Sequence, residues 1–413
     1  MGAGGDGGFG RRLSLAGKTA HQQHEGGRSP DSTLEVAQLA LKLGLTAFGG
    51  PAAHIAMLRD EIVTRRQWMT DAYFLDLLAA TNLIPGPNST EMVIHSGYHR
   101  AGRPGLVAAG ACFILPAALI TLAFAWVYGQ YGTTPQLESF LYGVKPVVIA
   151  VIVQAIWGLG RTIANQLPLL AVALIAFVLS LAGVNELVVL LGLGVAVMAL
   201  RVVSEHRHVD VLIALPALNE PLQRTPDLAP LLAAAVEPYS PLRLFLEFLK
   251  IGATLYGSGY VLLSFLQQDF VENLGWLTEQ QLLDAVAVGQ FTPGPVFTTA
   301  TFVGYLVGGW GGAALATIGI FVPAFMLVGV THPLVPKLRN SPWTAGFLDG
   351  VSAAAVGLMA SVTVVLGQAA LVGPYTIALA LVAALLLIRF RVNSAWLIVG
   401  GGVLGVLGGA IGI

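Results

Sequence analysis

The sequence predicts an all-α, polytopic membrane protein made of two homologous, inverted repeats, with helices broken at Pro-Gly-Pro motifs. Composition gives the class, because 55% of the 413 residues are hydrophobic and only 10% are charged, against about 25% charged in soluble proteins. The mean hydropathy is +0.76. Two motifs that each occur twice indicate the repeat. Gly and Pro inside apolar sequence indicate broken helices, since lipid tolerates open backbone only where protein or a cavity surrounds it.

The duplicated motifs keep one register. Lys42–Pro51 (KLGLTAFGGP) returns as Lys250–Gly259 (KIGATLYGSG), and Leu83–Glu91 (LIPGPNSTE) returns as Phe291–Thr299 (FTPGPVFTT), both at the same offset (250 − 42 = 208). After one deleted residue the offset is 207, through these pairs: Gly97 with Gly304, Pro116 with Pro323, and Gly143 with Gly350. An offset held over this length indicates a duplicated unit, which is common in transporters.

Four parts of the chain are expected. Residues 1–32 form a Gly-rich, polar tail without the apolar stretch of a signal peptide, which we interpret as disordered. The first repeat covers 33–204 and the second 241–413. Residues 205–240, which hold several prolines, link the two repeats.

The first repeat is expected to begin with an apolar helix over Thr33–Phe48, interrupted at the following glycines, and an amphipathic segment over Ala52–Thr64. Tyr73–Ile84 and Asn88–Arg100 are each too short to cross a bilayer, which takes about 20 residues. With Pro85-Gly86-Pro87 between them, they are predicted to be a re-entrant pair of half-helices. Four fuller apolar segments follow: Pro104–Tyr128, Leu141–Gly160, Leu167–Leu181 and Leu187–Val203.

The second repeat is expected to follow the same plan. It should contain a broken helix over Leu242–Phe270 and a half-helix pair over Gln280–Leu306. The run Gly308–Gly312 (GGWGG) is predicted to be a turn between membrane segments, because no strand precedes it as in a phosphate loop. The remaining segments are Gly312–Val330, Ala345–Leu366, Tyr375–Ile388 and Ala395–Gly409.

Loop charges predict that the two repeats are inverted, because Lys and Arg concentrate on the cytoplasmic side of membrane proteins. The loop Arg59–Asp71 carries three arginines, whereas its counterpart Gln267–Glu279 carries three acidic residues and no base. Equivalent loops are therefore expected on opposite sides. One observation opposes this topology: a half with five crossings places the basic N-terminal tail outside. The alternative is that the first helix is a hairpin or is topologically frustrated.

The two Pro-Gly-Pro motifs are the expected substrate site. A half-helix that begins after Pro87 or Pro295 has free N–H groups and a positive dipole end inside the membrane, which favours an anion. The alternative is that the Asn, Ser and Thr side chains only cap their own helices. The candidate binding residues are Lys42, Gly49, Gly50, Pro51, Pro85, Gly86, Pro87, Asn88, Ser89, Thr90, Lys250, Gly257, Ser258, Pro293, Gly294, Pro295, Thr298 and Thr299.

Lys42 and Lys250 are the most specific candidates in that set. Each lies in apolar sequence, and an ionisable residue within a membrane span indicates function by default. The alternative is that both reach along their stems to the membrane interface. Lys145 is a candidate for an additional charge, although Ser352 occupies its equivalent position in the second repeat.

Glu91 and His54 are candidates for proton coupling. With Asn88 as N-cap, Glu91 would occupy the third helical position and could instead complete a capping box. His54, whose counterpart is Leu262, could instead be a hydrogen-bonded interior histidine. The sequence leaves both alternatives open.

An enzyme, a metalloprotein and a nucleic-acid partner are not expected. The sequence has no His, Cys and carboxylate cluster with metal-site spacing, no nucleotide motif and no carboxylate dyad among Glu91, Asp284 and Asp349. The single cysteine, Cys112, excludes an intrachain disulfide. A net charge of −1 gives no field that favours nucleic acid. We expect a transporter in the lipid bilayer without a cofactor; its oligomeric state is open, a homodimer being one option.

The motifs resemble the chromate ion transporter family in its long, two-domain form. The resemblance rests on Phe48–Pro51 (FGGP), Ile84–Glu91 (IPGPNSTE), His95–Gly102 (HSGYHRAG) and Phe113–Pro116 (FILP), and it covers about Leu34–Leu200 and Leu242–Gly409. It implies a multi-pass inner-membrane carrier that exports chromate, driven by the membrane potential or a proton gradient, and so confers chromate resistance.

The resemblance leaves the substrate open within the small anions. Chromate is similar to sulfate in size, charge and shape, so a permease or exchanger for sulfate or another small anion is the alternative. The second repeat departs from the family motifs, because Tyr256-Gly-Ser-Gly259 replaces Phe-Gly-Gly-Pro and Val296 replaces Asn88. Its half-site is therefore expected to be less polar than the first.

Overall fold

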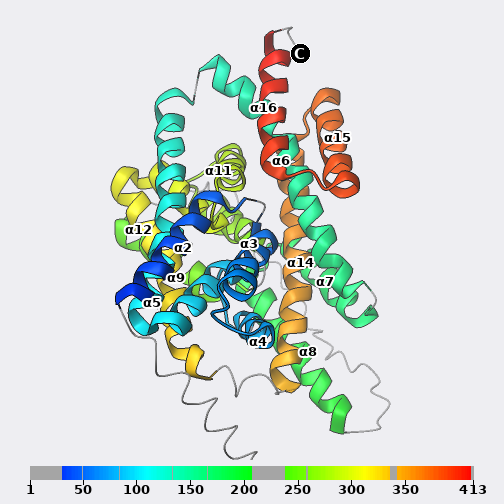
Figure 1. The fold of residues 1–413 in the computed structure, drawn as a ribbon. Helices are drawn as coiled ribbons and strands as arrows, with labels where there is room; N and C mark the ends of the chain where they lie inside the picture. Colours follow the sequence, from blue (N-terminus) through cyan, green and yellow to red (C-terminus); the bar gives the residue numbers. More distant parts are fainter. Residues whose placement is uncertain are drawn as a thin grey trace, which may run out of the picture.

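The computed structural model describes residues 30–48, 50–82, 84–132, 134–164, 166–206, 238–256, 259–334 and 342–410, and these ranges contain helices and turns but no strand (Figure 1). Nearly all of the expected N-terminal tail and most of the expected linker lie outside the described residues. So do Gly49, Gly257 and Ser258 of the candidate site. The described part confirms an all-α fold.

The two repeats have corresponding helices. The first contains α2 (Pro30–Thr46), α3 (Gly50–Arg59), the π-helix η1 (Asp60–Arg65), α4 (Asp71–Thr81), α5 (Asn88–Tyr131), α6 (Pro135–Ile163), α7 (Leu167–Leu181) and α8 (Glu186–His206). The second contains α9 (Pro241–Thr254), η2 (Gly259–Val261), α10 (Leu262–Leu266), the π-helix η3 (Gln267–Asn273), α11 (Glu279–Phe291), η4 (Val296–Thr298), α12 (Thr299–Thr331), η5 (His332–Leu334), α14 (Pro342–Ala370), α15 (Pro374–Phe390) and α16 (Ser394–Ala410).

The repeat extends to irregular backbone. The π-helices η1 and η3 occupy equivalent positions, and α5 and α12 each contain one non-helical pair. In α5 this pair is Ala101-Gly102, with φ 65° and ψ −148° at the glycine. In α12 it is Gly308-Gly309, with φ 61° and ψ −150° at the second glycine. Such dihedrals are almost restricted to glycine, so the same turn was retained in both halves.

Each turn makes a hairpin of two helical limbs, where the sequence predicted separate helices. The limbs pack backbone to backbone: a Cβ on Gly97 would overlap the carbonyl oxygen of Gly105, and a Cβ on Gly304 would overlap that of Gly312. The short limb after each Pro-Gly-Pro motif is therefore held against the longer, apolar limb. This differs from the expected re-entrant pair, Tyr73–Ile84 with Asn88–Arg100, because the short limb packs against the limb that follows it in the same helix.

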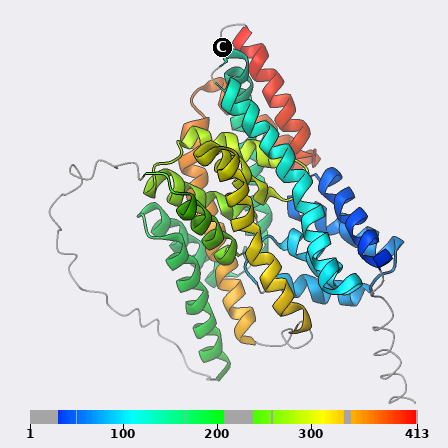
Figure 2. The ribbon, with the colours of Figure 1, turned by 90° about the vertical axis from the view of Figure 1, so that its left-hand side faces the viewer.

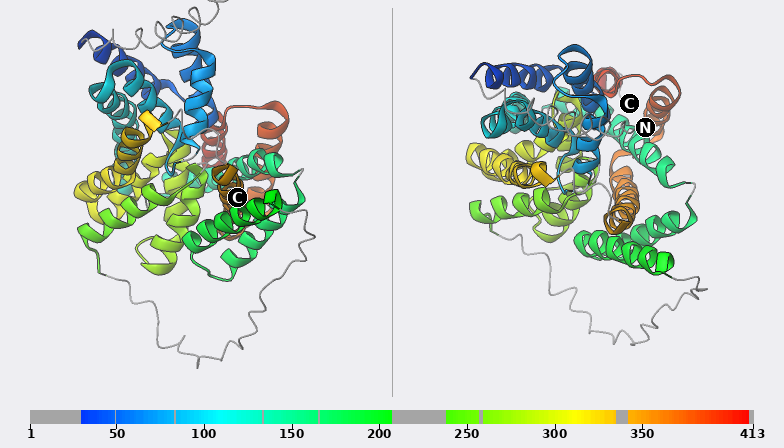
Figure 3. Two further views of the ribbon diagram at one scale, coloured as in Figure 1. Left: turned by 90° about the horizontal axis from the view of Figure 1, so that it is seen from below. Right: turned by 60° about the horizontal axis from the view of Figure 1, so that its bottom comes forward.

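Four long elements lie side by side in the order α2, α5, α12, α9, as Figure 3 shows from below. The repeats meet between α5 and α12. There, Ile94 and Leu106 of the first repeat join Ala324 and Val328 of the second in one buried apolar cluster. The order is symmetric about this contact, which is the pattern expected for two repeats related by a two-fold axis.

The last helices of each repeat pack on the other repeat. Helices α7 and α8 lie against α14, and α15 and α16 lie against α6 (Figures 1 and 2). Glycines allow the close approach, because a Cβ on Gly350 would overlap Gly194 and a Cβ on Gly143 would overlap Gly401. The two repeats are thus interlocked rather than separate domains.

Four of the described helices are long and apolar enough to cross a membrane: Asn88–Tyr131, Pro135–Arg161, Val296–Thr331 and Gly346–Ala370. They form two equivalent pairs, α5 with α12 and α6 with α14. Shorter apolar helices occupy Leu167–Leu181, Pro374–Phe390 and Ser394–Ala410. The protein is therefore a multi-pass membrane protein.

Inversion of the repeats can be tested with an impermeant maleimide on intact cells. After Cys112→Ala, single cysteines replace Thr64 or Asn273, which are exposed residues at equivalent ends of η1 and η3. Because η1 lies among arginines and η3 among carboxylates, we expect labelling of Asn273→Cys from outside and none of Thr64→Cys. Labelling of both positions from the same side would contradict the inversion.

Candidate functional site

The Pro-Gly-Pro loop of each repeat binds the broken helix of the other repeat. The backbone N–H of Gly86 donates to the carbonyl of Leu255 at 2.7 Å, and that of Gly294 donates to the carbonyl of Ala47 at 2.9 Å. Donors and acceptors occupy equivalent positions, so the two bonds are reciprocal. Gly86 and Gly294 have φ of 140° and 89°, a region that favours glycine. The duplicated motifs therefore meet across the boundary between repeats.

His54 connects the first broken helix to the first Pro-Gly-Pro loop. Its Nε2 lies 3.0 Å from the carbonyl oxygen of Ala47, and its Nδ1 lies 3.4 Å from Ser89 Oγ. A carbonyl only accepts, so Nε2 carries the proton and donates it. The side chain is buried, with the ring edge-on to Phe113. Ala47 thus accepts from both His54 and Gly294, which fixes where the first helix breaks.

The structure places Glu91 in a different role from the predicted capping box. Pro87, not Asn88, is the N-cap, because Asn88 is already helical and its amide donates to Asn82 Oδ1 at 2.7 Å. Glu91 is 0% exposed, and neither of its carboxylate oxygens has a hydrogen-bond partner among the described residues. A Cβ on Gly86 would overlap Glu91 Oε1, so the carboxyl group packs against the glycine of the Pro-Gly-Pro loop.

We call the residues that follow each Pro-Gly-Pro motif the first loop tip (Asn88–Glu91) and the second loop tip (Val296–Thr299). The two tips differ in the hydrogen bonds that their polar side chains make. At the second tip, the hydroxyl of Thr298 donates to the Pro295 carbonyl at 2.9 Å, and that of Thr299 donates to the Val296 carbonyl at 2.8 Å. At the first tip, Thr90 Oγ is buried without a partner in the described part of the chain, as are Asn88 Oδ1 and both Glu91 oxygens. The first tip therefore has unused polar groups. At the second tip both hydroxyls donate to local carbonyls, and that of Thr298 also accepts from Thr121 at 3.3 Å.

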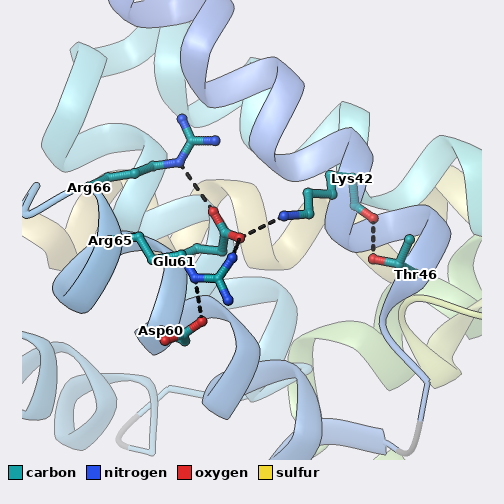
Figure 4. A network of polar contacts seen from close by, with 6 residues as sticks. All are labelled: Lys42, Thr46, Asp60, Glu61, Arg65 and Arg66. Carbon is teal, nitrogen blue, oxygen red and sulfur yellow. Dashed lines mark hydrogen bonds and ion pairs between the residues drawn. The ribbon is translucent and has the colours of Figure 1, made fainter.

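Lys42 and Lys250 are paired with acidic residues. Lys42 Nζ lies 2.6 Å from Glu61 Oε1, which Arg65 and Arg66 also approach (Figure 4). Lys250 Nζ lies 2.9 Å from Asp269 Oδ2 and also pairs with Glu247 of its own helix. Each lysine therefore joins the broken helix of its repeat to the following π-helix.

The acidic partners were missed in the sequence, although the register contains the signal. Glu61 and Asp269 are themselves 208 positions apart (269 − 61 = 208), as the lysines are. Glu61 lies outside the four candidate spans, and the hydrogen bond from Lys42 lowers the pKa of its carboxyl group, with Arg66 acting in the same direction. The lysines do not supply the unpaired positive charges that the sequence suggested.

The remaining candidate residues lie outside the contact between the two Pro-Gly-Pro loops and the broken helices. Gly50, with φ 79°, and Pro51 begin α3, so they supply the turn that follows the broken helix. Lys145 belongs to a separate cluster near the start of α11, where its Nζ lies 3.3 Å from Asp284 Oδ1. No group of three metal-ligating side chains occurs within the described ranges.

The two lysines should differ in their effect on stability. Lys42→Gln should cost about 1 kcal/mol or less, because Lys42 is half-exposed and the buried Glu61 carboxylate keeps two arginines. Lys250→Gln leaves Asp269, whose side chain is 7% exposed, without its lysine, so we expect a loss of roughly 3 kcal/mol or more. Thermal unfolding of the purified protein in detergent measures both.

The matched control for this experiment is the double variant Lys250→Gln, Asp269→Asn, which removes both charges. It should regain most of the lost stability, because position 269 is then neutral and Glu247, which also pairs with Lys250, keeps Arg243 at 3.7 Å. Equal destabilisation by Lys42→Gln and Lys250→Gln would contradict this account of the pairs.

Comparison with known proteins identifies the family. The family model described as chromate transporter matches residues 34–199 and 242–406. A chromate transport protein of Cupriavidus metallidurans is 33% identical over 383 residues, which cover 91% of this chain and 93% of the relative. One of Pseudomonas aeruginosa is 36% identical over 336 residues, 79% of each chain. A probable chromate transport protein of Synechococcus elongatus is 33% identical over 348 residues, 82% of this chain and 86% of the relative.

No solved structure matches the chain. The family model spans both repeats, and the relatives align over most of their length. The chain therefore belongs to the chromate transporter family.

Proposed function

We propose that this protein is a secondary active carrier that exports chromate across the cytoplasmic membrane and so confers chromate resistance. The family and the names of three relatives support the substrate. The reciprocal contact between two re-entrant loops supports a carrier, because substrate sites of transporters with inverted repeats lie where discontinuous helices of the two repeats meet. A membrane-embedded enzyme has no comparable support.

The first loop tip is the proposed binding site for the anion. The N–H groups of Asn88, Ser89 and Thr90 belong to the first turn of α5, where helical N–H groups have no acceptor within the helix. The dipole of the short limb adds a partial positive charge. The Thr90 hydroxyl, which is buried and unpartnered in the described structure, supplies a further donor. A tetrahedral oxyanion needs several donors of this kind at one point.

The complete burial of the Glu91 carboxyl group, without a hydrogen-bond partner among the described residues, supports the proposal most directly. An ionised carboxylate that is fully buried without a partner is strongly unfavourable, so in this conformation we assign it a proton. A protonated carboxyl group is a hydrogen-bond donor and attracts the anion, whereas an ionised one repels a dianion. Release of the proton therefore favours release of the anion, which couples the two at one residue.

The other motif residues position the site. His54 holds Ser89 and the Ala47 carbonyl in place, and the loops around Pro85 and Pro293 carry the bonds that join the repeats. Lys42 and Lys250 contribute positive charge to the pathway only where conformational change separates them from Glu61 and Asp269. The alternative substrate is sulfate or another small anion, which the same donors would accept.

Flux measurements in membrane vesicles of defined orientation test the substrate and the direction together. Labelled chromate and labelled sulfate are followed in inside-out and right-side-out vesicles that contain the full chain. An exporter accumulates chromate in inside-out vesicles, and this accumulation changes with an imposed potential or proton gradient. Faster accumulation of sulfate would favour the alternative, and the absence of anion flux would contradict a carrier.

Substitution of Glu91 tests the coupling. Glutamine keeps the size and donor capacity of a protonated glutamate but does not titrate, so Glu91→Gln should retain anion exchange and lose the pH dependence of net flux. Glu272→Gln, which changes an exposed carboxylate of η3, is the matched control and should behave as the wild type. Net flux of Glu91→Gln with an unchanged pH profile would exclude proton exchange at this residue.

A further inference from the structure

A second polar cluster lines a cavity away from the Pro-Gly-Pro loops. The cavity has a volume of about 600 Å³ and lies between the end of α5, the start of α6, the start of α11 and the end of α14. Its polar lining consists of Tyr128, Glu138, Tyr142, Lys145, Gln280, Gln281 and Asp284. Gln280 and Gln281 follow the acidic loop Gln267–Glu279, so the cavity adjoins the end of that loop.

Lys145 is held by two groups of which one is neutral. Its Nζ donates to Gln280 Oε1 at 2.5 Å and lies farther from Asp284 Oδ1, at 3.3 Å. The Gln280 amide nitrogen in turn donates to the Ala369 carbonyl at 3.3 Å, which keeps the amide oxygen turned towards Lys145. Lys145 is therefore positioned at the cavity by Gln280 even when its contact with Asp284 is lost.

Asp284 is almost fully enclosed. Its side chain is 4% exposed, and the Tyr128 hydroxyl donates to Oδ2 at 2.9 Å. The charged and titratable groups that line the cavity with it are Lys145, Glu138 and Tyr142 of α6 and Tyr128 of α5, while α14 contributes Ala369 and Ala370. Lys145 is the single cation in this set. Asp284 forms its ion pair, whereas Glu138 is exposed, so ionisation of Asp284 decides the charge next to Lys145.

The cluster joins residues of both repeats, and its lysine and glutamine have no counterparts at the equivalent positions. The register places Ser352 at the position of Lys145 and Ala72 at that of Gln280, whereas Asp284 has a counterpart in Asp76. The equivalent helices, α14 for α6 and α4 for α11, fold without the lysine and the glutamine. A structural role common to both repeats therefore does not explain Lys145 and Gln280.

We propose that this cavity is a second site for a divalent tetrahedral oxyanion, which binds to Lys145 when Asp284 is protonated. With Asp284 ionised, Lys145 is neutralised and the carboxylate repels the anion. With Asp284 protonated, the lysine retains its charge and the carboxyl O–H becomes available as a donor, while the other carboxyl oxygen still accepts from Tyr128. Binding therefore increases as the pH falls through the titration of Asp284 and decreases as the pH rises through it.

The inference rests on the proposed anion carrier and extends it to the opposite end of the pathway. The loop charges place this face outside, so the cavity would receive an exported anion before its release. A proton taken up by Asp284 from that side would hold the anion, and loss of the proton would expel it.

The test uses protection of a cysteine by sulfate, which remains a dianion over the whole pH range of the experiment. In full-length protein with Cys112→Ala, Tyr142→Cys places one thiol on the cavity wall. We expect sulfate, compared with chloride at equal ionic strength, to slow maleimide labelling several-fold at acidic pH and little at alkaline pH. Asp284→Asn, which keeps an acceptor for Tyr128, should give protection at every pH.

Lysine variants complete the test. Lys145→Gln should abolish protection, Lys145→Arg should retain part of it, and Ser352→Gln, at the equivalent position of the other repeat, should leave it unchanged. Absence of protection at acidic pH, or protection that survives Lys145→Gln, overturns the proposal. Chromate flux measured on the same preparations separates the two hypotheses, since flux without protection contradicts this site alone, and protection without flux contradicts the carrier alone.

Discussion

The fold depends on two backbone hydrogen bonds that the repeats exchange at its centre. A peptide N–H inside a membrane protein has no lipid acceptor and must be satisfied by protein. The N–H groups of Gly86 and Gly294 meet this requirement with the carbonyls of Leu255 and Ala47. The arrangement needs a broken helix to expose each carbonyl and a glycine to aim each N–H, which explains why Gly and Pro interrupt apolar sequence four times. The α5–α12 contact then surrounds these two hydrogen bonds, together with the terminal helices of each repeat that pack on the other repeat.

The features that both repeats share determine the fold, whereas the residues of the proposed anion sites differ between the repeats. The turns in α5 and α12, the π-helices and the lysine–carboxylate pairs occur in both halves. Glu91 occurs only in the first, where its counterpart is Thr299, and Lys145 only at the opposite face, where its counterpart is Ser352. Both proposed sites follow one electrostatic rule, since a buried carboxylate excludes a dianion when ionised and admits it when protonated. The two faces of this pseudo-symmetric fold therefore differ in their chemistry, which a carrier with a net transport direction requires.

Much of the fold was predictable because the register carries structural information. The helix Leu167–Leu181, the turn at Gly308–Gly312 and the short limbs after the Pro-Gly-Pro motifs follow from apolar run length and glycine position. The packing of α7 and α8 on the other repeat was not predictable, because their apolar surfaces are compatible with several partners. The partners of Lys42 and Lys250 could have been found, since Glu61 and Asp269 share the register. The capping box failed because the helix begins one residue earlier than Asn88 as N-cap requires, which turns Glu91 towards Gly86.

The central claim is that the first loop tip binds the anion and the second does not. Equilibrium binding of labelled chromate to the purified protein, with Thr90→Val compared with its counterpart Thr298→Val, tests this most directly, because each variant removes one hydroxyl and keeps the side-chain shape. The Thr298 hydroxyl already donates to the Pro295 carbonyl, so its loss should leave the affinity unchanged. Loss of the Thr90 hydroxyl should weaken binding by roughly tenfold or more, the value of one hydrogen bond to a charged group. Equal affinities of the two variants would contradict the account.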